Sequence, residues 1–132
     1  MAGRPGPRSV FWALFSLRGR IRRSTFLLGA ALIATLWWVC LAQVFSAVDG
    51  SSEQESWLLT LGALVLFSSY CLYALAHKRL HDLGYRGFFA LIIVVAGTFI
   101  PFLTIAGLTA LAVVPGEQDN NDYGPPPVRS KT

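Results

Sequence analysis

The sequence HKRLHDLGYRG occupies residues 77–87 and separates two long apolar runs. No charged residue occurs within 57–76 before it or within 88–114 after it, and a third uncharged run, 25–48, lies nearer the N-terminus. A bilayer core about 30 Å thick is crossed by about 20 residues of helix, and each of the three runs reaches that length. The pattern predicts an all-α integral membrane protein with three transmembrane helices.

Composition supports a membrane location and a single domain. Hydrophobic residues make up 54% of the chain and charged residues 14%, whereas soluble proteins carry about 25% charged residues. We expect one membrane domain over residues 10–127, with a mobile N-terminal tail at 1–9 and a flexible C-terminal tail at 128–132. Within that domain, Val10 to Phe15 is aromatic and precedes several arginines, which predicts a short amphipathic segment in the headgroup layer.

The third run, 88–114, is longer than one straight span requires and carries Gly97 and Pro101 near its middle. Proline removes a backbone hydrogen bond and kinks a helix. We favour one long span that is tilted and kinked at Pro101, because each half of the run is too short to cross a bilayer alone. A re-entrant pair of half-helices is the alternative. The first places the C-terminus outside the cell and the second keeps it in the cytoplasm.

Charge placement predicts the orientation. Eleven Lys and Arg against seven Asp and Glu give a net charge of +4. Six arginines precede the first run, and residues 77–87 contain Lys78, Arg79 and Arg86, whereas the charged residues of the loop at 49–56 are all acidic. By the positive-inside rule, the N-terminus and residues 77–87 lie in the cytoplasm and the acidic loop lies outside.

Helix ends are marked by local signals. Ser24 is the expected N-cap of the first long helix, and either Ser52 or Ser56 that of the second. Gly84 is the expected C-cap glycine at the end of the second helix. An anion in the last turn of a helix opposes the helix dipole, so Asp82 requires a compensating cation. We expect its carboxylate to pair with one or more of Arg79, Arg20 and Arg23.

These charges define a candidate cytoplasmic polar cluster, formed by Arg20, Arg23, Lys78, Arg79, His81 and Asp82. His77 and His81 are four residues apart, next to Asp82, and could share a helix face. A zinc site usually needs a third protein ligand of defined geometry, and Lys78 and Arg79 place positive charge beside the proposed ion. We therefore predict no metal, no cofactor and no catalytic residue.

The C-terminal segment contains a candidate tail motif, Asn121, Tyr123 and Gly124. Turn-forming residues at 120–124, followed by prolines at 125–127, predict a segment that folds back at the membrane surface and then extends.

Taken in order, the motifs resemble the domain of unknown function 805 family of small bacterial inner-membrane proteins. The resemblance covers the chain from about Phe15 to Pro127 and rests on GRIRRSTF at 19–26, KRLHD at 78–82 with Gly84, GFF at 87–89, Pro101, PG at 115–116 and NDYG at 121–124. It implies an integral inner-membrane protein with few spans, and it transfers no catalytic residue.

The expected function is non-enzymatic. We expect a structural or accessory membrane protein whose basic face associates with anionic lipid headgroups, with a second copy of itself or with another membrane protein, and not with nucleic acid. A subunit of a small-molecule or ion transporter is the alternative, although membrane pathways for ions usually contain ionisable side chains. An enzyme acting on lipid through His81 and Asp82 ranks third.

Overall fold

The computed structural model describes residues 10–127, apart from the side chains of residues 98 and 101. All its regular elements are helices, as predicted: α1 (Val10–Phe15), α2 (Arg23–Ser46), α3 (Ser52–Asp82), α4 (Phe88–Phe99) and α5 (Pro101–Val113). The tails predicted at 1–9 and 128–132 lie outside the described residues.

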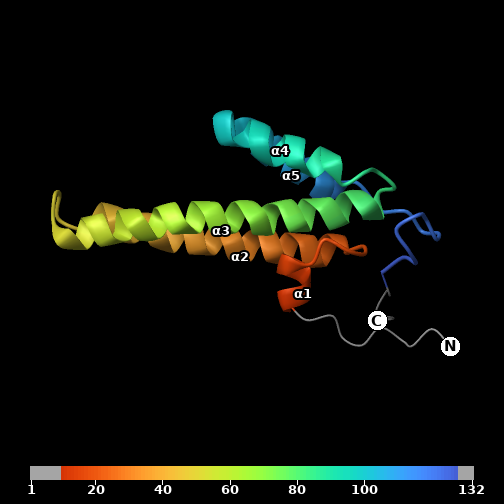
Figure 1. Ribbon diagram of the computed structural model, residues 1–132, viewed down its shortest axis with the longest axis horizontal. Helices are drawn as coiled ribbons and strands as arrows, with labels where there is room; N and C mark the ends of the chain where they lie inside the picture. The colour runs from red at the N-terminus through yellow and green to blue at the C-terminus, as the bar shows by residue number, and fades with distance from the viewer. Residues whose placement is uncertain (1–9, 128–132) are drawn as a thin grey trace.

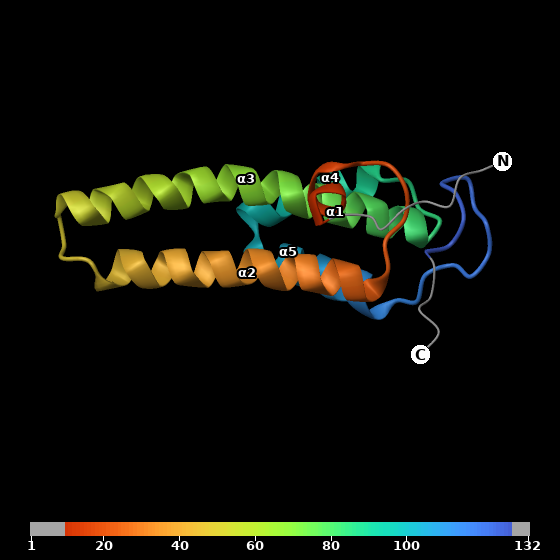
Figure 2. The same cartoon turned by 90° about the horizontal axis from the view of Figure 1, so that it is seen from below.

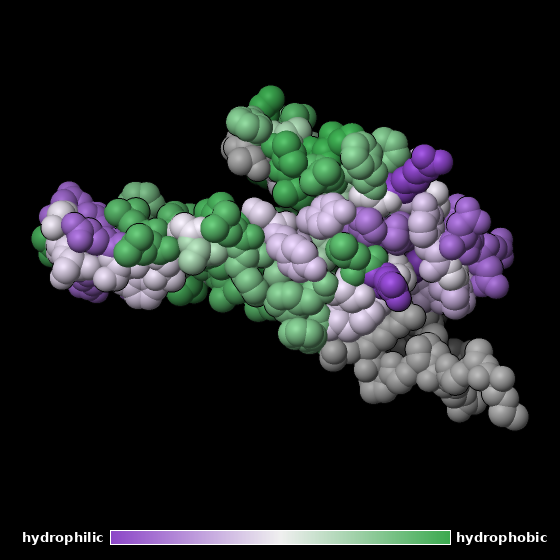
Figure 3. Space-filling model, in the orientation of Figure 1, coloured by the Kyte–Doolittle hydropathy of each residue, from purple (hydrophilic) through white to green (hydrophobic). Residues whose placement is uncertain are grey.

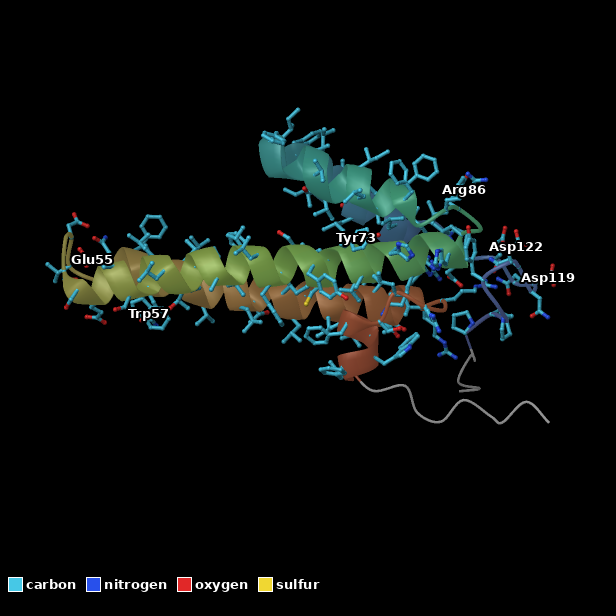
Figure 4. All side chains as sticks on the ribbon, in the orientation of Figure 1. Glu55, Trp57, Tyr73, Arg86, Asp119 and Asp122 are labelled. Atoms are coloured by element: carbon cyan, nitrogen blue, oxygen red, sulfur yellow. The ribbon has the colours of Figure 1, made fainter. Side chains whose placement is uncertain are left out.

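The long helices α2 and α3 form an antiparallel pair that runs the length of the molecule (Figures 1 and 2). Both are long and apolar enough to cross a membrane. Apolar surface covers most of the middle of the pair and the two ends are hydrophilic (Figure 3). Glu55 lies at one end, and Asp119 and Asp122 lie at the other (Figure 4).

Small side chains bring the two long helices together. A Cβ atom at Gly29 of α2 would meet the Cδ atoms of Leu75 in α3 at 2.8 and 3.0 Å. Leu75 is fully buried, and Phe26 of α2 is buried beside it in the same core cluster. Lipid is as apolar as leucine, so close packing of this kind contributes more to helix association in a membrane than removal of apolar surface from water does.

Two of the predicted helix starts are wrong by one residue or more. Helix α2 begins at Arg23 with Arg22 as its N-cap, and no side chain caps it, so Ser24 does not serve as the cap. Helix α3 is capped by Ser51, whose hydroxyl accepts a hydrogen bond of 3.1 Å from the backbone N–H of Gln54. An N-cap serine must lie outside the helix with extended backbone angles, and Ser51 meets this condition.

The single kinked span predicted over 88–114 does not form. The helix breaks at Ile100, whose φ of −131° and ψ of 88° lie outside the helical region. A residue that precedes proline is disfavoured in the helical conformation, so Pro101 ends one helix and begins the next. Helices α4 and α5 then fold against each other as a hairpin (Figure 1).

Glycines allow the two arms of this hairpin to pack closely. A Cβ atom at Gly97 would overlap the side chain of Thr104, and one at Gly107 would lie 2.9 Å from Cγ2 of Ile93. Ile93 and Gly107 would be about 21 Å apart in one continuous helix. Contact between them therefore excludes the straight or gently kinked span and agrees with the alternative of two half-helices.

The hairpin and α1 lie on opposite sides of the α2–α3 pair, both near the end that contains residues 77–87 (Figure 1). Helix α1 is fixed to α3 by the Tyr70 hydroxyl, which donates a 2.9 Å hydrogen bond to the carbonyl of Phe15, and by contact of the Phe15 ring with Phe67. The chain after α5 returns to this same end. The fold thus gathers α1, the hairpin and the C-terminal segment around the last turns of α3.

Candidate functional site

The last turns of α3 end where the sequence predicts. Gly84 has a φ of +77°, a conformation that suits glycine, and its N–H donates to the carbonyl of His81. The N–H of Tyr85 donates 2.9 Å to the carbonyl of Leu80. These two bonds form a Schellman motif, which ends α3 cleanly and places the side chains of its last turns at the junction with the other elements.

Asp82 is paired with two guanidinium groups, as its position in the last helical turn predicts. Its Oδ1 lies 3.0 Å from both Nε and Nη2 of Arg20, and its Oδ2 accepts from Nη1 of Arg79. All three residues are at most 4% exposed. Arg23, the third expected partner, is exposed and is not part of this ion pair.

Arg79 also holds the C-terminal end of α5. Its Nε donates a 2.8 Å hydrogen bond to the carbonyl of Leu111, and its Nη2 donates to the carbonyl of Val114. The last carbonyls of a helix have no partner within the helix. A cation there also interacts favourably with the helix dipole, by about 0.3–1 kcal/mol at the surface and up to about 2 kcal/mol when partly buried.

Lys78 likewise donates hydrogen bonds to backbone carbonyls near the C-terminal end of α1. Its Nζ donates to the carbonyls of Trp12, at 2.9 Å, and of Ala13, and it lies 4.5 Å from the centre of the Trp12 ring. Lys78 is fully buried, and an ammonium group is costly to bury without such partners. Both Lys78 and Arg79 lie near the C-terminal end of α3, where a cation could interact with the dipole of that helix. In the structure they satisfy the ends of two other helices.

Arg20 connects this cluster to the C-terminal segment. Besides Asp82, its guanidinium donates to the carbonyls of Glu117 at 2.6 Å, Asp119 at 2.9 Å and Gly124 at 3.1 Å. The segment therefore lies at the end of the molecule that carries the N-terminal arginines. The single-span prediction requires residues 115–127 to lie at the opposite end of the α2–α3 pair, and they do not lie there.

The three residues of the tail motif build a tight turn over His81. The side-chain amide of Asn121 donates 2.9 Å to the carbonyl of His81, and its Oδ1 accepts from the N–H of Tyr123 at 3.0 Å. Gly124 has a φ of +115°, and its N–H donates to the carbonyl of Asn121. The Tyr123 ring stacks on the His81 ring, with centroids 3.8 Å apart and planes 6° apart.

The two histidines lie in a column of aromatic rings. The ring of His81 also contacts that of His77 at 4.4 Å, with the planes 68° apart, and Tyr73 continues the column at 5.4 Å from His77. Gly87 leaves the space that His77 fills, because a Cβ atom there would overlap the imidazole. Within residues 10–127, no group of three or more histidine, cysteine, aspartate or glutamate side chains is placed to hold a metal ion.

A cleft of about 460 Å³ opens beside the cluster. It is lined by the start of α2, at Arg22, Arg23 and Ser24, and by residues 116–118, 126 and 127 of the chain after α5. Arg79 and Asp82 also line it. Gly116 allows the C-terminal segment to approach the ion pair, since a Cβ atom there would overlap the Asp82 carboxylate.

The sequence predicts the pairing of Asp82 with Arg20 and Arg79, but not the contacts of the other residues of the candidate cluster. Arg20, Arg79 and Asp82 are joined by ion pairs. The ring of His81 packs against His77 and Tyr123, Arg23 lines the cleft, and Lys78 contacts α1. The sequence did not indicate the roles of Arg22, Gly116 and Glu117. The sequence predicts the turn at 120–124, but the three roles depend on contact between residues 115–127 and the ion pair, which no local pattern indicates.

A family model described as protein of unknown function (DUF805) matches residues 14–125. No curated protein and no solved structure matches the chain.

Proposed function

Because this chain belongs to the DUF805 family, whose function is unknown, we propose its role from its charge pattern and its geometry. It is a non-catalytic structural or accessory protein of a bacterial inner membrane, and its cytoplasmic face associates with anionic lipid headgroups. The proposal rests on the contrast between two sets of cations. Arg20, Lys78 and Arg79 are buried and bonded to backbone carbonyls. The surface set, which is exposed or partly exposed, comprises Arg18, Arg22, Arg23 and Arg86.

In the proposed arrangement α2 and α3 cross the bilayer and the α4–α5 hairpin enters only its inner leaflet. Helix α4 has 12 residues, or about 18 Å, which is little more than half of a core about 30 Å thick. The tip of the hairpin supports lipid contact, because Phe99 is 81% exposed and Phe102 is 74% exposed. The N-terminal arginines, residues 77–87 and the 115–127 segment then share the cytoplasmic side.

The contacts of the cluster favour this role over catalysis or transport. Both carboxylate oxygens of Asp82 are occupied by guanidinium groups, and a general acid or base needs an available oxygen. Two hydroxyl groups of α3 that could line a polar transport path are hydrogen-bonded within the helix pair. Ser68 accepts from Nε1 of Trp37 at 3.0 Å, and Ser69 donates to the carbonyl of Val65 at 2.7 Å.

Cysteine labelling tests the orientation. In a background with Cys40→Ala and Cys71→Ala, single variants Ser52→Cys and Asp122→Cys are treated with a membrane-impermeant maleimide on spheroplasts of a bacterial host. We expect Ser52→Cys to react on intact spheroplasts and Asp122→Cys only after the membrane is permeabilised. Reaction of both sites from the same side would contradict the proposed arrangement.

Lipid analysis tests the function. The full chain is purified from native membranes, and the ratio of anionic to zwitterionic lipid retained is compared with that of the bulk membrane. We expect enrichment of anionic lipid, and loss of that enrichment when Arg18, Arg22, Arg23 and Arg86 are all replaced by Gln. A retained lipid composition equal to that of the bulk membrane would contradict the proposal. A stoichiometric protein partner without lipid enrichment would support protein association instead.

A further inference from the structure

The cleft at the start of α2 carries more positive charge than its own carboxylates balance. Its lining includes the guanidinium groups of Arg22, Arg23 and Arg79 and the carboxylates of Asp82 and Glu117, which leaves an excess of one positive charge. The Asp82 carboxylate is already shared between Arg20 and Arg79. Arg20 and Arg23 are also close enough to Arg79 for their charges to repel it. An anion in this cleft would reduce that repulsion.

Arg22 and Arg23 are available to such an anion. Neither side chain makes a hydrogen bond or an ion pair with another residue in the 10–127 part of the chain. Glu117, the other acid in the cleft, is engaged by Asn121, whose side-chain amide donates 2.7 Å to its Oε2. A guanidinium group is a planar fork of donors that matches two oxygens of a phosphate.

The position of the cleft at the start of α2 indicates which kind of molecule would supply the anion. Arg22, Arg23 and Ser24 directly precede Thr25, the first residue of the uncharged run of α2. If α2 crosses the bilayer, these residues lie in the headgroup layer, where the phosphate groups of lipids are found. The cleft volume of about 460 Å³ falls within the range of about 300–1,000 Å³ that is usual for ligand sites.

We propose that this cleft binds the phosphate group of one anionic lipid headgroup, with Arg22 and Arg23 as its ligands. This inference rests on the proposed function. It assigns the association with anionic lipid to one saturable site instead of to the whole basic face. A phosphate monoester carries a charge of about −1.5 to −2 near neutral pH. The site therefore favours phosphatidic acid over phosphatidylglycerol, whose phosphate is a diester with a single charge.

The test uses the full chain in a neutral detergent. Binding of dioctanoyl phosphatidic acid, dioctanoyl phosphatidylglycerol, dioctanoyl phosphatidylcholine and inorganic phosphate is measured by native mass spectrometry and by thermal shift. We compare the Arg22→Gln/Arg23→Gln variant with Arg18→Gln/Arg86→Gln, which removes the same charge from exposed side chains outside the cleft lining. The first should bind phosphatidic acid about 30-fold more weakly, roughly fivefold for each lost cation. The second should change the affinity less than about twofold.

A variant with increased affinity for phosphatidic acid provides an independent test, because misfolding would lower the affinity. Glu117→Gln removes the carboxylate that would repel an anion in the cleft, and its amide oxygen can still accept from Asn121. We expect this variant to bind phosphatidic acid about fivefold more tightly, the effect of one unit charge near contact distance in water. Unchanged or weaker binding by a folded Glu117→Gln variant would contradict the site.

The remaining outcomes separate the site from the proposed function. An equal loss of affinity for phosphatidic acid in the two double variants would contradict the cleft as a specific site. It would remain consistent with lipid association through the whole basic face. No preference for either anionic lipid over phosphatidylcholine would overturn both. Inorganic phosphate that binds as tightly as phosphatidic acid and displaces it would support a phosphate site and overturn the lipid as its ligand.

Discussion

Lys78 and Arg79 are neighbours in the sequence and hold the C-terminal ends of two different helices. Lys78 donates to carbonyls near the end of α1, and Arg79 donates to carbonyls at the end of α5. Successive residues of a helix are rotated by about 100°, so two adjacent cations point in different directions from α3 and reach different helices. The C-terminal ends of α1, α3 and α5 therefore all lie around the last turns of α3. Their dipoles offset part of the positive charge that Asp82 alone does not neutralise.

Loss of Lys78 should release α1 and leave the rest of the fold in place. We expect Lys78→Met to lower the amide-exchange protection of residues 10–16 by about tenfold to hundredfold, because a hydrogen bond from a charged donor contributes about 1.5–3 kcal/mol. Hydrogen-deuterium exchange in detergent micelles measures this. Arg86→Met, which removes an exposed cation, is the control and should leave the protection of α1 unchanged. Equal protection in both variants would show that Lys78 does not hold α1.

Asp82 should be the most sensitive residue of the cluster. In Asp82→Asn the guanidinium groups of Arg20 and Arg79 are left facing each other, and breaking a buried pair in this way costs about 3–5 kcal/mol. The free energy of unfolding in detergent, measured by chemical denaturation, should fall by that amount. Asp119→Asn is the control, since Asp119 is exposed and only its backbone carbonyl is bonded to Arg20. It should change stability by less than about 0.5 kcal/mol.

Combining Asp82→Asn with Arg20→Gln completes a double-mutant cycle. The second change removes one of the two uncompensated charges, so the double variant should lose less stability than the sum of the single losses. Contacting residues of this kind usually show interaction energies of about 0.5–3 kcal/mol. Strict additivity would indicate that Arg20 acts through the carbonyls of the C-terminal segment and not through the carboxylate.

Short sequence patterns predicted those features of the fold that depend on residues close together in the chain. The uncharged runs marked α2 and α3, Gly84 marked the end of α3, and the dipole cost of Asp82 predicted its arginine partners. Pro101 was ambiguous, because proline permits a kink as well as a break. The packing of Gly97 on Thr104 and of Gly107 on Ile93 decides in favour of a break. Such contacts join residues from two arms, and a hydropathy pattern does not contain them.

A crosslink tests the hairpin. In a background with Cys40→Ala and Cys71→Ala, the pair Ile93→Cys/Gly107→Cys should form a disulfide under mild oxidation, because these residues are in contact and a disulfide requires Cα atoms within about 7 Å. The control pair Ile93→Cys/Phe99→Cys joins two positions of the same helix α4, about 9 Å apart along its axis, and should stay reduced. A mobility shift on a non-reducing gel detects the bond. Crosslinking of neither pair would contradict the packed hairpin.

The C-terminal turn should depend on one of two adjacent asparagines. The amide of Asn121 bridges the carbonyl of His81 and the carboxylate of Glu117, whereas Asn120 is exposed. Each net hydrogen bond contributes about 0.5–1.5 kcal/mol, so Asn121→Ala should raise the amide-exchange rate of residues 117–124 by about tenfold. Asn120→Ala should leave it unchanged. If both variants exchange at the rate of the unmodified chain, Arg20 and the stacking of Tyr123 on His81 hold the segment without help from Asn121.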